Sequence, residues 1–523
     1  MLKYKNISQC LESITKKYPD KVAVTDLDKS YTWKDINFLT ELATRHIYEK
    51  GIRKGNYVAL WVNNSVSWIV LFLALQRIGA ITVLLNTAYK WRELEAALEN
   101  CDVEYIFYSK SFKDSDHERT INQLNIDKLP YFKEAYLVPD EPMSLPDGKY
   151  KSNLSIYESE YDPDIVSNIL FTSGTTGVAR GAMLTHRNLI CNSMAIVERL
   201  QWTSEDKICL SVPMYHCFGI TVGILGALHT GASLHIMRKF SSELAFKTIE
   251  EHKCTIFNGV PTMFLAMKNS SKRFNYNLTS FKGGLVAGSS IIPEEFKAIC
   301  EEFNLDRLNT AFGQTESSPA ITVSSDNDSL EKRANTSGKP LADVEVRIVA
   351  DGKVVAANVE GEIQTRGYHV MAGYYKMLEE TEKAIDKDGW LSTGDLGCID
   401  EEGYLHVTGR IKDIIVRGGE NISPVEIERV ICQIPGVASV KVVGVKAAVI
   451  QEEVVACIIW KKGENMPEEE VKKIISANLA DYKVPRYILD YEKFPMNSSG
   501  KVLSKELSEL SYQRIYNKKE NIY

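Results

Sequence analysis

Short apolar runs alternate with amphipathic segments along the first two thirds of the chain. These runs are rich in β-branched and aromatic residues and short enough to be strands. The clearest lie at 57–62, 80–85, 105–109, 168–172, 207–212 and 255–260. Helical periods fall between them, as at 242–252, where apolar residues recur every three or four positions. This alternation predicts α/β layers built on largely parallel sheets.

The pattern changes from about residue 340. The strings VEVRIV, GEIQTRG and GYLHVTGR predict short strands joined by glycine-containing turns, as in an antiparallel barrel or sheet. Beyond 409–413 come two strand-like runs, ASVKVVGV and EVVACIIW, and a helix that starts at Pro467 with glutamates in its first turn. We therefore predict a large domain at 1–410, a small α+β domain at 411–523 and a hinge near 410–413.

Composition narrows the class of protein. The 523 residues are too many for one core, and 44% hydrophobic and 25% charged residues are ordinary for a soluble enzyme. A net charge of -7 with scattered Lys and Arg gives no indication of nucleic-acid binding. The ten cysteines never approach CxxC spacing, which favours reduced thiols and a cytoplasmic location over disulfides or a zinc site.

Two segments resemble targeting or membrane elements only superficially. The N-terminal twenty residues lack a continuous apolar core, so we expect an amphipathic helix and not a signal peptide. The apolar stretch 68–85 is interrupted by Gln76, Arg77 and Gly79. We expect a buried helix that stops near Gly79, followed by a strand, in place of a membrane span.

The stretch FTSGTTGVARGAMLTH, at 171–186, is the first candidate site. Small and hydroxylated residues run from Thr172 to Gly181, and Arg180 adds a positive charge. A preceding strand and a following helix, capped by Thr185, would make a cradle for phosphates. Only two residues separate Gly174 from Gly177, whereas GxxxxGK[ST] has four between its glycines, so the loop is not that motif. A solvated turn rich in Ser, Thr and Gly remains an alternative reading of this stretch alone.

Further motifs follow in a fixed order. They are VPMYHCFG at 212–219, TIFNGVPTMF at 255–264, LVAGSSI at 285–291, NTAFGQTESS at 309–318, GWLSTGDLG at 389–397, GRIKDIIVRGGENISPVEIE at 409–428 and NSSGKVLSKEL at 497–507. Together with TSGTTG, this set resembles the adenylate-forming enzymes: acyl-CoA synthetases, aryl-CoA ligases, luciferases and peptide-synthetase adenylation domains. The likeness spans roughly residues 10 to 510. One departure stands out, because Ala179-Arg180 replaces the usual Pro-Lys.

The resemblance implies a two-step ligase with a mobile small domain. A carboxylate attacks the α-phosphate of ATP to give acyl-AMP and pyrophosphate, and a thiol, usually of CoA, then displaces AMP. It implies ATP and CoA as substrates and Mg²⁺ as the cation that bridges phosphate oxygens. Its members have a large α/β domain with parallel sheets and a small barrel-like part, followed by a smaller α+β domain.

The resemblance also assigns roles to residues. The phosphates would contact Thr172, Ser173, Gly174, Thr175, Thr176, Gly177 and Arg180, and Mg²⁺ would contact Thr176 and Glu316. Gly288, Ser289 and Ser290 would form the wall of the adenine and acyl sites. Phe312 would stack on adenine, and the nucleotide would contact the whole string Ala311, Phe312, Gly313, Gln314 and Thr315. Asp395 and Arg410 would hold the ribose, Lys412 would be the hinge, and Gly418 and Gly419 would admit the pantetheine arm beside Arg417 and Glu420. The catalytic residues would be Lys501, His216 and Glu316.

The acid itself is less constrained by the sequence. No carboxylate lies in the string 215–219, so an α-amino acid, whose ammonium would be buried unpaired, is disfavoured. Phe218, Ile220, Val260, Met263 and Phe264 are candidates for an apolar pocket. We expect a medium- or long-chain fatty acid. The alternatives are an aromatic or alicyclic acid, an acyl-AMP ligase that loads a carrier protein in trans, and a nucleotide-binding protein without catalysis.

Overall fold

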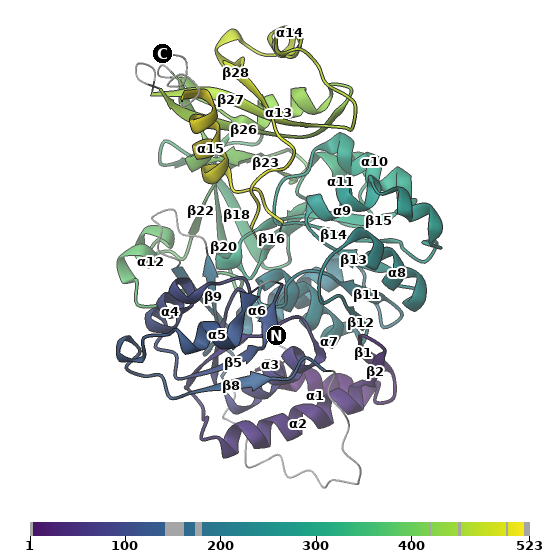
Figure 1. Cartoon of the computed structure of the whole chain (residues 1–523), viewed down its shortest axis with the longest axis vertical. Coiled ribbons are helices and arrows are strands. Elements are labelled where there is room, and N and C mark those ends of the chain that lie inside the picture. Colours follow the sequence, from purple (N-terminus) through teal and green to yellow (C-terminus); the bar gives the residue numbers. More distant parts are fainter. Residues whose placement is uncertain are drawn as a thin grey trace.

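The computed structural model describes residues 4–113, 115–141, 162–172, 180–417, 420–447, 451–497 and 500–516. The large N-terminal part holds two mixed sheets and an antiparallel sheet, and the small C-terminal part sits at its top (Figure 1). The chain between these two parts is short: β23 ends at Arg410, a single 3₁₀ turn (Ile411–Asp413) follows, and β24 begins at Ile415. The domain division at 410–411 stays a prediction.

The first sheet has nine strands, six of them parallel. β1, β12, β11, β13, β14 and β15 run parallel, whereas β2, β16 and β17 complete the edges in the antiparallel sense. In spatial order the strands are β17 (Lys339–Pro340), β16 (Ala320–Val323), β15 (Arg307–Gly313), β14 (Gly283–Val286), β13 (Ile256–Asn258), β11 (Lys207–Leu210), β12 (Ser233–Ile236), β1 (Val22–Asp26) and β2 (Lys29–Thr32).

The second sheet has seven strands. Its parallel part is β9, β4, β3, β5 and β8, and β10 and β21 add an antiparallel edge. The strands are β21 (Gly373–Tyr374), β10 (Arg180–Thr185), β9 (Val166–Thr172), β4 (Ile81–Leu84), β3 (Tyr57–Trp61), β5 (Tyr105–Ser109) and β8 (Glu134–Val138). A two-stranded ribbon, β6 (Ser111–Phe112) and β7 (Ser115–Asp116), lies beyond β5.

Helices cover both faces of these sheets. The layer between them holds α1 (Ile7–Lys17), α2 (Trp33–Glu49), α3 (Val66–Ile78), α6 (His186–Arg199), a π-helix (Phe218–Leu225) and α7 (Gly226–Thr230). The outer face of the first sheet is covered by α8 (Ser242–His252), α9 (Pro261–Lys268), α10 (Pro293–Phe303) and α11 (Leu330–Asn335). The outer face of the second sheet carries α4 (Trp91–Asn100) and α5 (His117–Asn122).

Two-sided burial explains the apolar runs in the sequence. In β3, Val58 and Leu60 face the central layer, whereas Ala59 and Trp61 face the outer layer under α4. Successive side chains of a strand point to opposite faces, so a strand covered on both sides must be apolar throughout. The apolar stretch at 68–85 is a buried helix that ends at Gly79 (φ +81°) and a strand, as expected. No helix within the described ranges has the length and apolar character needed to cross a bilayer.

The region after residue 340 is an antiparallel sheet of five strands, as its turn-rich pattern indicated. They are β19 (Lys353–Val354), β18 (Val344–Ala350), β20 (Gly361–Gly367), β22 (Leu391–Ile399) and β23 (Leu405–Arg410), and α12 (Leu378–Ala384) precedes β22. The small part has a sheet of β25 (Glu420–Ile422), β24 (Ile415–Arg417), β27 (Gln451–Trp460), β26 (Val437–Ala447) and β28 (Tyr487–Asp490). The helices α13 (Pro424–Cys432), α14 (Glu468–Asn478) and α15 (Ser504–Tyr516) pack on it.

Candidate functional site

One group of the predicted site residues lies at or after the ends of parallel strands of the first sheet. His216 comes after β11, Val260 after β13 and Gly288 after β14, and the string from Ala311 to Thr315 covers the end of β15 and the turn that follows it. Carboxyl ends of parallel strands meet at one edge of a sheet, which is where α/β proteins bind ligands. The topology therefore gathers segments that are widely separated in the sequence.

The loop after β14 is exposed. Gly288, Ser289 and Ser290 all lie at the surface, so this loop is not a buried packing turn. Gly288 has φ +91°, and a Cβ there would lie 3.2 Å from Cγ1 of Val260. A glycine is therefore favoured by both the backbone conformation and the close approach.

The string after β15 is held in place by a close backbone approach. A Cβ on Gly313 would lie 1.9 Å from the carbonyl oxygen of Pro319, so no other residue fits there without moving the chain. Phe312 is half-buried and packs against both the central core and the antiparallel sheet. Its ring keeps one part in reach of solvent, as a surface for stacking adenine requires.

Asp395 and Arg410 form the best-defined ion pair of the site. The two residues lie opposite each other on β22 and β23, and the Nε of Arg410 donates to Oδ1 of Asp395 at 2.7 Å. Asp395 is only 4% exposed. Burial raises the pKa of Asp395, and the positive charges of Arg410 and Lys501 oppose that rise.

Lys501 lies next to this pair, although it belongs to the small C-terminal part. Its electrostatic environment includes Arg410, Asp395 and Asp413. Burial lowers the pKa of Lys501 and the charge of Arg410 lowers it further, whereas the two aspartates act in the opposite direction. The structure therefore brings together three of the predicted residues: Lys501, Asp395 and Arg410.

Glu316 lies in a 3₁₀ turn after β15 and is oriented by a tyrosine. The hydroxyl of Tyr374, on β21, donates to Oε1 of Glu316 at 2.8 Å. Burial and the charge of Glu316 raise the pKa of Tyr374, so the hydroxyl keeps its proton. The carboxylate of Glu316 is partly exposed.

This arrangement fits a cation that arrives with phosphates. Among the described residues, no group of three or more His, Cys, Asp or Glu side chains could hold a metal ion. Mg²⁺ commonly binds through one or two carboxylates together with substrate phosphates and water. A single oriented carboxylate such as Glu316 fits that kind of site.

Arg180 is paired with a residue of α12. Its Nη2 lies 2.6 Å from Oε2 of Glu380, and its guanidinium lies 5.3 Å from the ring centroid of Tyr374. Glu380 also accepts from Lys383 at 2.9 Å. Arg180 and Glu316 thus flank the same tyrosine, one at its ring and one at its hydroxyl.

The phosphate loop corrects one expectation. Thr172 ends β9 and Arg180 begins β10, and the two residues pair across an antiparallel ladder. The loop therefore joins two strands of a hairpin and does not run into a helix; α6 begins six residues later, where Thr185 caps it through the backbone N–H of Asn188 as expected. Ser173, Gly174, Thr175, Thr176 and Gly177 lie outside the described residues.

His216 lies two residues before the π-helix Phe218–Leu225. Burial lowers the pKa of His216 to about 4, so its ring is neutral near pH 7. Its Nε2 is buried and has no hydrogen-bond partner among the described residues. Phe218 and Ile220 belong to the central core, whereas Val260, Met263 and Phe264 belong to the outer core under α8 to α10. Ile220 and Phe264 are fully buried and contribute first to packing.

The segment around the predicted hinge is only partly described. Lys412 lies in the 3₁₀ turn Ile411–Asp413, between β23 and β24. Arg417 is bound within the small part: its Nε lies 3.1 Å from Oε2 of Glu453, and its Nη1 donates to the carbonyl oxygen of Tyr482 at 2.9 Å. Gly418 and Gly419 lie outside the described residues.

Sequence reasoning missed Tyr374 and Glu380. Tyr374 follows a glycine in the string GYYK, and Glu380 lies in a short charged helix. Neither position carries a local signal of function, because their partners Glu316 and Arg180 are far away in the sequence. The pairing of β21 with β10, which brings them together, could not be inferred from either string.

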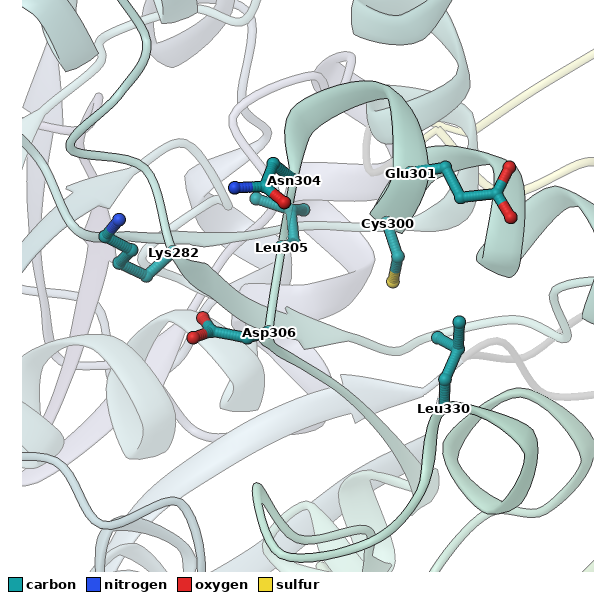
Figure 2. Close-up of a pocket in the computed structure, with 7 residues that line it drawn as sticks. All are labelled: Lys282, Cys300, Glu301, Asn304, Leu305, Asp306 and Leu330. Carbon is teal, nitrogen blue, oxygen red and sulfur yellow. The ribbon is translucent and has the colours of Figure 1, made fainter.

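The surface hollow drawn in Figure 2 lies elsewhere. It has a volume of about 270 Å³ and is lined by Lys282, Cys300, Glu301, Asn304, Leu305, Asp306 and Leu330. Lys282 immediately precedes β14 and Asp306 immediately precedes β15. The hollow therefore lies at the amino edge of the parallel strands, opposite the predicted site.

Comparisons with known proteins agree with this architecture. Residues 11–375 match the family of AMP-binding enzymes, and residues 426–501 match the AMP-binding enzyme C-terminal domain. The chain belongs to this family. Its relatives include YngI of Bacillus subtilis (strain 168), a protein named as an acyl-CoA synthetase, which is 37% identical over 97% of each chain. The mouse mitochondrial medium-chain acyl-CoA ligase ACSF2 is 34% identical over 97% of this chain and 88% of its own length.

A solved structure confirms the fold. The ATP-bound MatB of Rhodopseudomonas palustris superposes with a TM-score of 0.85 and 26% identity, over 98% of this chain and all of the other. The class predicted from the motifs is therefore confirmed: the chain is an AMP-forming acid–CoA ligase. The roles of the individual site residues stay predictions.

Arg180 stands where the family usually has a lysine, and this difference leads to a prediction about ATP. If Arg180 contacts the phosphates, Arg180→Ala should raise KM for ATP about tenfold or more, because charge-assisted hydrogen bonds are lost. Arg180→Lys should restore most of the loss. Arg187→Ala is the matched control, since Arg187 pairs with Asp164 on the surface and should leave KM unchanged. Unaltered ATP use by Arg180→Ala would show that the assignment is wrong.

The environment of Lys501 leads to a prediction about pH. If the protonated lysine acts in adenylation, the rate of acyl-AMP formation should fall as pH rises through the lowered pKa of Lys501, at a pH below the ordinary lysine range. Lys501→Arg keeps its proton and should lack this alkaline decline, whatever its maximal rate. Single-turnover formation of acyl-AMP, followed from about pH 7 to about pH 10, provides the measurement. An identical decline in both proteins would contradict the role.

Proposed function

We propose that this ligase activates a medium- or long-chain fatty acid and transfers the acyl group to CoA. The observation that carries the proposal is the electrostatic interaction of Lys501, in the small part, with the buried Asp395–Arg410 pair. The arrangement supports adenylate formation because it sets a cation from the small part beside a two-oxygen acceptor suited to ribose hydroxyls.

In the first step, the acid's carboxylate oxygen attacks the α-phosphorus of ATP. The new O–P bond forms as the bond to the β-phosphate oxygen breaks, and pyrophosphate leaves with its electron pair. Lys501 would neutralise charge on the attacking carboxylate and the α-phosphate, and Arg180 would neutralise charge on the departing phosphates. Glu316 and Thr176 are the predicted ligands that would hold Mg²⁺. When bound, Mg²⁺ supplies charge neutralisation at the phosphate oxygens.

In the second step, the sulfur of CoA attacks the acyl carbon and loses its proton to solvent. The carbon–oxygen bond to AMP breaks, and AMP leaves with the electron pair. The small part would turn about Lys412 so that the loop of Gly418 and Gly419 replaces Lys501 near the acyl group. After this rotation Lys501 would no longer be near Asp395, and the second step would not need it there. The two half-reactions are therefore expected to depend on different residues.

The neutral ring of His216 and the apolar side chains near it support a fatty acid as the substrate. Burial keeps His216 uncharged, and Cys217, whose pKa burial raises to about 12, is likewise neutral. A substrate ammonium would thus find no charged partner in these two residues. A relative that is named as a medium-chain acyl-CoA ligase supports the same class of substrate. A cytoplasmic location remains part of the proposal.

A panel of carboxylic acids tests the proposal. Release of pyrophosphate and AMP from ATP and Mg²⁺ is measured with short to long fatty acids and with benzoate-like and cinnamate-like acids, each with and without CoA. We expect fatty acids of medium or long chain to turn over, and multiple turnover to require CoA. Turnover confined to aromatic acids would contradict the substrate class, and turnover indifferent to CoA would indicate a carrier-protein acceptor.

A further inference from the structure

We propose that Thr262 is a positioning residue that docks the Lys501 turn on the large domain for adenylation and has no part in thioester formation. This inference rests on the proposed function, because it assigns Lys501 to the first half-reaction. Thr262 is the second residue of α9, in the large domain, and none of the site assignments above includes it.

The observation is a hydrogen bond between the two parts of the molecule. The hydroxyl of Thr262 donates to the carbonyl oxygen of Gly500 at 3.1 Å. Gly500 immediately precedes Lys501, so the contact fixes the backbone from which the lysine side chain extends. Thr262 is half-buried, and its hydroxyl lies at the interface and not at the open surface.

Hydrogen bonds tie together the described residues at the two ends of the turn that carries Lys501. The backbone N–H of Asn497 donates to the carbonyl oxygen of Lys501 at 2.9 Å, and Lys501 returns its own N–H to Oδ1 of Asn497 at 2.9 Å. Met496 and Val502 close the turn as an antiparallel bridge. Gly500 and Lys501 are adjacent in the chain, so a contact that holds the Gly500 carbonyl also restricts where Lys501 lies.

The fit around Gly500 is close on the side of the large domain. Gly500 has φ +83°, and a Cβ there would lie 3.0 Å from Oγ1 of Thr262 and 3.3 Å from Cγ2 of Val260. The other methyl carbon of Val260, Cγ1, is the atom that a Cβ on Gly288 would approach to 3.2 Å. Val260 therefore separates the predicted adenine loop from the Lys501 turn, and Thr262 fixes the turn against it.

The contact is specific to one arrangement of the two parts. If the small part turns away after adenylation, the Gly500 carbonyl leaves Thr262 and both groups return to water. The hydrogen bond then stabilises the adenylation arrangement relative to the other one. One such bond is worth about two- to tenfold in an equilibrium constant.

The first test needs no substrate. Trypsin cuts after Lys501 when the turn leaves the large domain, and mass spectrometry detects the fragment that begins at Val502. Cleavage of a docked turn proceeds through local opening, so its rate follows the docking equilibrium. We expect Thr262→Val, which keeps the shape and removes the hydroxyl, to raise this rate about two- to tenfold. Thr262→Ser keeps the donor and should behave as the wild type does.

The second test separates the half-reactions. Thr262→Val should slow single-turnover formation of acyl-AMP by a similar factor and leave the transfer of a preformed acyl-AMP to CoA at the wild-type rate. Unchanged cleavage and unchanged adenylation would overturn the inference. Equal slowing of both half-reactions would also overturn it, since that result indicates a general effect on the pocket or fold. If the wild-type protein forms no acyl-AMP from any acid, the proposed function fails, while the cleavage rates still decide the docking.

A double-mutant cycle tests the contact from the other side. Gly500→Ala introduces backbone strain and a clash with the Thr262 hydroxyl. The backbone strain is the same with Thr262 and with alanine in its place, so it cancels from the coupling between the two substitutions. We expect Gly500→Ala to reduce adenylation less in a Thr262→Ala background than in the wild type. Strictly additive effects of the two substitutions would contradict direct contact.

Discussion

The ion pair between Asp395 and Arg410 is the interaction on which the site depends. A carboxylate that is 4% exposed would be costly to keep charged alone, and Arg410 supplies the compensating charge at 2.7 Å. Arg410 is also the last residue of β23, directly before the 3₁₀ turn that leads into the small part. The residue that pairs with Asp395 therefore directly precedes the turn that leads into the small part.

This placement explains why the lysine can come from a different part of the molecule. Lys501 enters a region where one buried acid already has one partner, so burial and the charge of Arg410 both lower its pKa. The lowered pKa means that the charged form of Lys501 is less favoured there than in water. The phosphates and the acid's carboxylate would supply the missing negative charge, and their departure as pyrophosphate would remove it. We infer that the same electrostatics that favour closure for the first step favour opening for the second.

A second set of contacts organises the phosphate end of the site. Tyr374 orients Glu316 through its hydroxyl, and Glu380 holds Arg180 beside the ring of the same tyrosine. These contacts come from β21 and α12, two short elements between the antiparallel sheet and the second sheet. The predicted magnesium ligand and the unusual arginine thus share one structural support.

Much of the fold could be predicted from the sequence, because inner parallel strands such as β3 and β5 are buried on both faces and must be apolar. The predicted bounds of β5 and α8 agree with the structure, and Gly79 ends α3 as expected. The error at the phosphate loop has a physical cause: β10 begins with Arg, Gly and Ala directly after the glycine-rich loop, so its start could not be distinguished from that loop. Contacts such as Tyr374 with Glu316 and Thr262 with Gly500 depend on how distant segments pack, which no local pattern records.

The most direct test of the account is the effect of Lys501→Ala on the two half-reactions measured separately. We expect formation of acyl-AMP from acid and ATP to fall by about two orders of magnitude or more, as loss of a transition-state charge contact implies. Transfer of a preformed acyl-AMP to CoA should stay close to the wild-type rate. Equal loss in both half-reactions, or adenylation that survives the substitution, would contradict the assignment of Lys501 to the first step.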